Sequence, residues 1–223
     1  MEQFMAVSGI AAPMMQINID TDQIIPALYL GGPDAKGYGA HLFANWRFLS
    51  DGKPNPDFIL NCAPYDRAEI LLAGRNFGCG SSRERAPKAL REFGFRAVIA
   101  PSFGGIFFNN CFRNGLLPVV LPVEQVDRLV DAVQSGDKRT KVTVDLRSKV
   151  VSLDADTHFP FDVPETLRQM LLMGVDEIDQ TLSHRSEIDA FRARDRGRRP
   201  WAYIEPPIPT TPSDTPALPG AGH

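Results

Sequence analysis

The stretch Glu69–Ala100 reads EILLAGRNFGCGSSRERAPKALREFGFRAVIA and decides the fold class. It begins and ends with short apolar runs, at 69–73 and 96–100, that predict two buried strands. Between them lie a glycine-rich turn and then a helical pattern over Ala86–Phe93. A strand, a loop, a helix and a second strand in this order are typical of α/β proteins. The stretch therefore predicts an α/β fold.

The rest of the chain continues the mixture of strands and helices. A third apolar run at 116–121 predicts another buried strand, and Pro122–Val133 carries an apolar stripe of 3.6-residue period that predicts an amphipathic helix. Further patterns predict a β-hairpin and two helices, at 141–145 with 150–153, at 164–173 and at 178–193. A chain of 223 residues is long enough to bury one such core.

Two segments break this pattern. The segment 31–57 is rich in Gly, Pro, Asp and aromatic residues, and a loop of this length is usually functional or mobile, so we expect it to cover a site or a subunit interface. Six prolines crowd the chain between Pro206 and Pro219, and such a composition cannot form a packed core. We expect one domain over residues 1–196 and a disordered tail or arm over 197–223.

Charge and composition are typical of a soluble protein of small-molecule metabolism. The net charge of −3 gives no overall attraction to nucleic acid, and the arginine run at 192–199 is typical of a solvated helix end, with RNA or an acidic partner as the alternative. The N-terminus lacks the segments of a signal peptide, and no stretch approaches about 18 apolar residues. We therefore expect a cytoplasmic protein that binds neither nucleic acid nor a membrane.

The cysteines and histidines do not form a metal site by their spacing. Cys62, Cys79 and Cys111 lie far apart, and an odd number of cysteines argues against a disulfide framework, so we expect buried thiols. No CxxC pair is present and the four histidines are scattered. We expect no metal or cluster bound by this chain alone.

The loop Gly74–Pro87 carries the residues with the clearest chemical meaning. Two glycines make the turn permissive, and Ser81-x-x-Glu84 matches a capping box, which predicts an ordinary helix start. A helix from Ser82 would leave Pro87 past the first turn, so a start nearer Ala86 is the alternative. In either case backbone N–H groups and the guanidinium of Arg83 converge, which favours a carboxylate or a phosphate.

Several motifs in order resemble a known family. These are the segments NFGCGSSRE, IAPSF, FFNNCFRNGLLP, DTDQIIP and GYGAHLF, at 76–84, 99–103, 107–118, 20–26 and 37–43. Together they make the chain similar, over about residues 5–195, to the small subunits of 3-isopropylmalate dehydratase in the aconitase superfamily. The resemblance implies a layered β/β/α swivelling domain.

The resemblance also implies roles for individual residues and for a partner. Ser81 would be the base that takes a proton from carbon, while Ser82 and Arg83 would hold a substrate carboxylate. Thr21 and Asp22 would line the same site, although a turn-forming Asp is a common alternative. A large subunit would carry the [4Fe–4S] cluster, and the pair would interconvert the dicarboxylates 2-isopropylmalate and 3-isopropylmalate in leucine biosynthesis.

Two departures from the family pattern bear on the substrate. Arg85 stands where the family usually has His, and the segment 29–36 lacks an arginine often found there, with Lys36 as the nearest substitute. The alternatives are a related dehydratase of 2,3-dimethylmalate or another 2-alkylmalate, and a non-catalytic module that binds an anion. We expect His41 and Trp46 to have structural roles.

Overall fold

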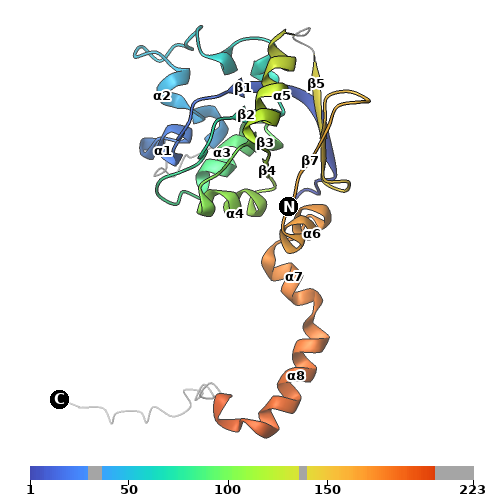
Figure 1. Cartoon of the computed structure of the whole chain (residues 1–223). Helices are drawn as coiled ribbons and strands as arrows, with labels where there is room; N and C mark the ends of the chain where they lie inside the picture. The colour runs from blue at the N-terminus through green and yellow to red at the C-terminus, as the bar shows by residue number, and fades with distance from the viewer. Residues whose placement is uncertain (30–36, 136–139, 204–223) are drawn as a thin grey trace, which may run out of the picture. The chain divides into compact units, whose positions relative to one another are not determined.

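The computed structural model describes residues 1–29, 37–135 and 140–203 (Figure 1). Lys36, most of the segment 29–36 and the proline-rich tail lie outside the described residues. Contacts group the chain into two units, Met1–Gln180 and Thr181–His223. This grouping by contacts does not test the domain boundary that we expect near residue 196, which stays a prediction.

The first unit is built on a seven-stranded sheet with the order β4-β3-β2-β1-β5-β6-β7. The strands are β1 (Ala6–Met14), β2 (Ile70–Ala73), β3 (Ala97–Ala100), β4 (Leu117–Val120), β5 (Lys141–Asp145), β6 (Val150–Ser152) and β7 (His158–Pro160). Strands β1 to β4 run parallel, whereas β5 is antiparallel to β1, β6 to β5 and β7 to β6. The strands predicted from the sequence are confirmed, and β1 and β7 join them.

Helices connect and cover these strands. They are α1 (Thr21–Ile24), α2 (Ala44–Arg47), α3 (Arg85–Phe93), α4 (Gly105–Arg113), α5 (Val123–Ser135), α6 (Glu165–Met173), α7 (Glu177–Ser183) and α8 (Arg185–Arg198), with short 3-10 turns η1 (Ala27–Tyr29), η2 (Tyr38–His41), η3 (Ile59–Asn61), η4 (Tyr65–Arg67) and η5 (Pro200–Ala202). The helix predicted over 178–193 is two helices, because the backbone turns at His184 between α7 and α8. The other predicted helices are confirmed.

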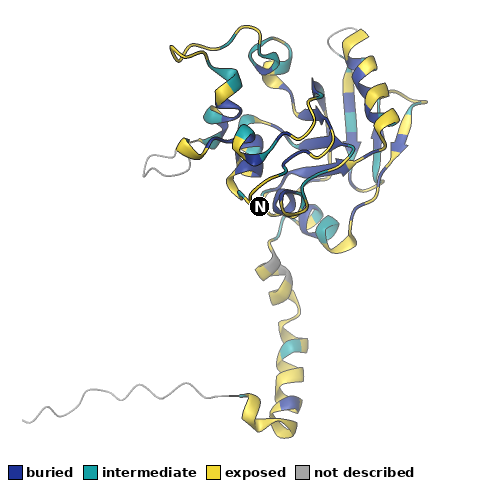
Figure 2. Ribbon diagram, turned by 60° about the vertical axis from the view of Figure 1, so that its left-hand side comes forward, coloured by how far each residue is buried: buried dark blue, intermediate teal, exposed yellow. Residues whose placement is uncertain are grey.

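The sheet has a hydrophobic layer on each face. Because side chains alternate along a strand, Leu72 and Leu71 point to opposite faces. Leu72 belongs to the cluster that contains Leu129 of α5, and Leu71 belongs to the cluster that contains Leu90 of α3. Figure 2 shows the buried strands between helices whose outer surfaces are exposed. The fold is therefore the predicted layered α/β arrangement.

In the second unit, α8 is mostly exposed and its end is held by polar contacts. Asp195 accepts two hydrogen bonds of 2.8 Å from Arg199 and one of 2.9 Å from the hydroxyl of Tyr203. The arginines from Arg192 to Arg199 are exposed, as expected for a solvated helix end. Within the described part of the chain, no helix is long and apolar enough to cross a membrane.

Candidate active site

The loop between β2 and α3 continues the sheet past the ends of its strands. On one side it pairs with the segment that follows β1: Gly78 N–H donates to the carbonyl of Ile19 at 2.7 Å, and Thr21 N–H donates to the carbonyl of Cys79 at 3.0 Å. The loop backbone is therefore hydrogen-bonded along this side up to Cys79.

On the other side the loop pairs with the segment that follows β3. Phe77 N–H donates to the carbonyl of Ser102 at 3.1 Å, and Gly104 N–H donates to the carbonyl of Phe77 at 2.9 Å. The ring of Phe77 is fully buried and packs edge-on against Phe107, with centroids 5.5 Å apart. The carboxyl ends of three parallel strands thus converge on this one loop.

Two glycines allow this close approach. A Cβ at Gly78, where φ is +70°, would lie 2.2 Å from the ring of Phe107. A Cβ at Gly104 would lie 2.4 Å from the carbonyl oxygen of Gly78. Phe107 begins the motif FFNNCFRNGLLP at 107–118, whereas Gly104 lies between that motif and IAPSF at 99–103 and carries no sequence signal of its own. Only residues without a side chain fit at these two positions.

The sequence predicts a capping box at Ser81 and Glu84, and this prediction is wrong. Helix α3 begins at Arg85, and the side chain of Glu84 makes no capping hydrogen bond. The alternative prediction, a helix start near Ala86, is confirmed. This start leaves Pro87 in the first turn, where its missing N–H costs no helical hydrogen bond. Ser81 and Ser82 are consequently exposed on the loop rather than used as caps.

A capping box does occur, at the neighbouring helix α1. Asp20 Oδ1 accepts from Gln23 N–H at 2.7 Å, and Gln23 Oε1 accepts from Asp20 N–H at 2.8 Å. The sequence signal is the same four-residue spacing, here as Asp-x-x-Gln. The capping box gives α1 a defined start directly beside the loop.

Helix α1 brings a carboxylate to the arginine of the loop. A terminal guanidinium nitrogen of Arg83 lies 2.7 Å from Asp22 Oδ1, and the two side chains are 24% and 50% exposed. The Nε of Arg83 is buried without a partner among the described residues. Ser82, Arg83, Glu84 and Arg85 line a surface pocket of ≈ 280 Å³. Two of the four lining residues are arginines, whose guanidinium groups can bind a carboxylate.

Thr21 lies beneath the loop. It is 2% exposed, and its hydroxyl donates a 2.7 Å hydrogen bond to the carbonyl of Ser81. The structure therefore brings together the five residues that the sequence singled out: Thr21, Asp22, Ser81, Ser82 and Arg83. Their roles toward a substrate stay predictions.

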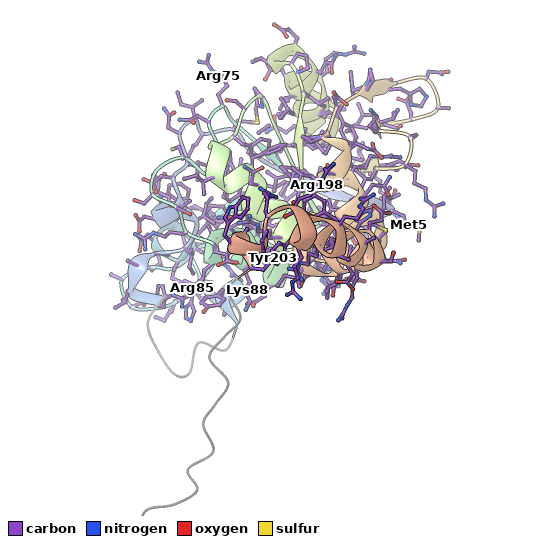
Figure 3. All side chains as sticks on the ribbon, turned by 90° about the horizontal axis from the view of Figure 1, so that it is seen from below. Met5, Arg75, Arg85, Lys88, Arg198 and Tyr203 are labelled. Carbon is purple, nitrogen blue, oxygen red and sulfur yellow. The ribbon has the colours of Figure 1, made fainter. Side chains whose placement is uncertain are left out.

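The described part of the segment 31–57 packs against α3. The guanidinium carbon of Arg85 lies 5.7 Å from the ring centroid of Tyr38, and the ammonium of Lys88 lies 5.2 Å from it. Figure 3 labels Arg85 and Lys88 next to each other. The imidazole ring of His41 stacks on the ring of Tyr29 with the centroids 4.0 Å apart, which agrees with the structural role that we expect for His41. Arg85 thus has an aromatic packing partner.

Trp46 also packs within this segment. Its ring stacks on Phe43 with centroids 5.8 Å apart and lies 6.4 Å from the ring of Phe58. The expected structural role of Trp46 is confirmed by these contacts.

The three cysteines are free, and the expectation of buried thiols is correct for Cys111 but wrong for Cys62 and Cys79, which are half-buried. Cys111 is fully buried in α4, and burial raises the pKa of its thiol well above the ordinary value.

Because the thiolate is the reactive form, Cys111 should stay unmodified by iodoacetamide at pH 8 in the native protein. Mass spectrometry of tryptic peptides checks this, and the same cysteine should react fully after unfolding in guanidinium chloride. Modification of native Cys111 at the rate seen for half-buried Cys62 would contradict the expectation.

No metal-binding group is apparent in residues 1–29, 37–135 and 140–203. Sets of three or more His, Cys, Asp or Glu side chains close enough to share an ion do not occur there. The described residues therefore do not fit the ligand set that an iron–sulfur cluster needs.

Comparison with known proteins places this geometry in a family. Residues 1–124 match the aconitase C-terminal domain family. The chain is 51% identical to the 3-isopropylmalate dehydratase small subunit of Cupriavidus necator, over 92% of this chain and 100% of that protein. It is 49% identical to the small subunit of the same name from Rhodospirillum centenum, over 91% and 99% of the two chains.

A solved structure agrees with these relatives. The crystal structure of 3-isopropylmalate dehydratase (leuD) from Methanocaldococcus jannaschii superposes with a TM-score of 0.58 at 27% identity, covering 84% of this chain and 99% of that one. The sequence relatives and the structural neighbour therefore indicate the same family. The chain belongs to the aconitase C-terminal domain family and, within it, to the 3-isopropylmalate dehydratase small subunits.

Proposed function

We propose that this chain supplies the base and a carboxylate clamp to a two-subunit hydro-lyase that interconverts 2-isopropylmalate and 3-isopropylmalate. One observation carries the proposal: the exposed hydroxyls of Ser81 and Ser82 and the guanidinium of Arg83 stand on a single loop whose backbone is pinned on both sides. A rigid loop with exposed polar ends is suited to meet a substrate held by another subunit.

The proposed reaction begins with proton transfer to Ser81. Its oxygen, as the alkoxide, takes a proton from the carbon next to a carboxylate, while hydroxide leaves from the neighbouring carbon and a double bond forms. Return of water with the opposite regiochemistry gives the isomer and restores the base. A serine hydroxyl is a weak acid, so the alkoxide needs the cationic surroundings of Arg83 and exclusion of water.

Arg83 and Ser82 are proposed to hold one substrate carboxylate. The guanidinium can donate two parallel hydrogen bonds to a carboxylate, and Asp22 at 2.7 Å restricts the plane in which it lies. Ser82 adds a hydroxyl donor beside it. This arrangement binds the substrate through its anionic end and leaves the alkyl group to other parts of the enzyme.

The proposal requires a large subunit as partner. Because the chain belongs to the small subunits of this family, we propose a [4Fe–4S] cluster on the large subunit, where it would act as a Lewis acid toward the departing hydroxyl. We place the pair in the cytoplasm, without nucleic acid or membrane as partners.

Reconstitution tests the proposal. The isolated chain should show no turnover, and the chain with its co-expressed large subunit should interconvert the two isopropylmalates, followed by the absorbance of the unsaturated intermediate. A panel with 2,3-dimethylmalate and other 2-alkylmalates decides the alkyl group. Tight binding of a dicarboxylate by the isolated chain, with no turnover in the reconstituted pair, would instead favour the anion-binding module.

The Arg83 clamp gives a separate prediction. Arg83→Lys keeps the charge but loses the two-pronged geometry, so KM for the dicarboxylate should rise by about tenfold or more. Steady-state kinetics of the reconstituted pair measures this, with Arg75→Lys, an exposed arginine of the same loop, as the matched control. An unchanged KM in Arg83→Lys would remove Arg83 from substrate binding.

A further inference from the structure

The geometry points to Thr21 as a positioning residue for Ser81, acting through the loop backbone rather than on the substrate. The inference rests on the proposed function, because it needs Ser81 to be the base.

Thr21 contacts both sides of the turn that precedes the base. Its N–H donates to the carbonyl of Cys79 at 3.0 Å, and its hydroxyl donates to the carbonyl of Ser81 at 2.7 Å. Between these two acceptors lies Gly80, with φ of +87°. A single residue therefore bridges the turn and ties down the residues before and after Gly80.

Thr21 is itself held in place from the opposite side. It is the first residue of α1, whose start is set by the capping box of Asp20 and Gln23. The next turn buries Ile24 and Ile25 completely in the core, and the carbonyl of Thr21 accepts from Ile25 N–H at 3.0 Å. The backbone of Thr21 is thus fixed by the capping box and by the core. A residue that positions a neighbour must itself be held in place in this way.

The burial of Thr21 argues against direct contact with a substrate. Only 2% of the residue is exposed, and its hydroxyl proton is already donated to Ser81. Asp22, the next residue, is half exposed and faces Arg83. Two neighbours on α1 therefore serve the loop differently: one orients the backbone of the base, and the other orients the guanidinium.

Thr21→Val tests the inference, because valine keeps the shape and removes the hydroxyl. A displacement of the base by about 1 Å can cost about 100-fold in rate, so we expect kcat to fall by about 10- to 100-fold and kcat/KM by the same factor. Kinetics are measured in the two-subunit enzyme at saturating large subunit, and circular dichroism checks the fold. Thr21→Ser, which restores the hydroxyl, should rescue most of the lost turnover.

A double substitution separates positioning from independent effects. If Thr21 acts only through Ser81, then Thr21→Val should cause no further loss in the Ser81→Ala enzyme. Thr143→Val, which removes a 2.8 Å hydroxyl bond to Ser8 on another part of the sheet, is the matched control and should leave turnover unchanged.

Three results would overturn the inference. The first is a kcat of the double variant that falls by the product of the two single losses. The second is a raised KM with unchanged kcat in Thr21→Val, and the third is an equal loss of kcat in Thr21→Ser and Thr21→Val. Failure of the proposed function would look different, because the wild-type pair would then be inactive or Ser81→Ala would keep its turnover.

Discussion

Ser81→Ala should lower kcat of the reconstituted two-subunit enzyme by about 10²- to 10⁴-fold, the range for loss of a general base. The variant removes only the hydroxyl of an exposed side chain, while the carbonyl that accepts from Thr21 at 2.7 Å remains. The fold and the large-subunit contact should therefore be unchanged, and KM should change little.

Initial rates with 2-isopropylmalate and 3-isopropylmalate measure this loss in both directions. Ser148→Ala, at an exposed serine in the turn between β5 and β6, is the matched control and should be as active as the wild type. Equal circular dichroism and thermal midpoints show that the comparison is between folded proteins. A Ser81→Ala enzyme with more than a tenth of the wild-type kcat would exclude Ser81 as the base.

Gly104→Ala is expected to have the second largest effect, because it presses on the backbone of the loop. An added Cβ would lie 2.4 Å from the carbonyl oxygen of Gly78 and 3.1 Å from the Cα of Cys79. These are backbone atoms, so no side-chain rotation relieves the overlap. The backbone at Gly104 has φ of −61°, so alanine suffers no torsional strain there and the effect is steric.

We expect kcat/KM to fall by about 100-fold in Gly104→Ala, since the loop that carries Ser81 must shift. Overpacking of this kind should also lower the free energy of unfolding by about 1–3 kcal/mol, measured by urea denaturation. Gly105→Ala is the control, because a Cβ at this exposed neighbouring position meets nothing within 4 Å. Activity of Gly104→Ala equal to that of Gly105→Ala would contradict the proposed packing of the loop.

Local patterns predicted most of the regular elements. The apolar stripe after Pro122 predicted α5, because Val126, Leu129 and Val133 recur at the helical period and are all buried. Strand β1 escaped prediction, since Gly9 and Pro13 interrupt the apolar run that marks a strand. Pro13 nevertheless pairs in register with Leu72.

The helix start shows a competition that sequence spacing could not resolve. Ser81 and Glu84 satisfy the capping-box spacing, and Asp20 and Gln23 satisfy it as well, but only the second pair forms the hydrogen bonds. At the first pair, Pro87 and the backbone bonds that pin the loop favour a helix that starts at Arg85. The same spacing thus predicts a cap correctly in one place and incorrectly in the other.

The sequence by itself determined the α/β class, the glycine-rich loop with its two serines and arginine, and the resemblance to the family, because these depend on residues close together in the chain. Only the tertiary structure decided that Thr21 lies under Ser81, that Asp22 faces Arg83 and that Gly104 touches Gly78. Those contacts join segments that are distant in sequence, and they depend on the register with which the ends of β1, β2 and β3 are aligned, which no local period encodes.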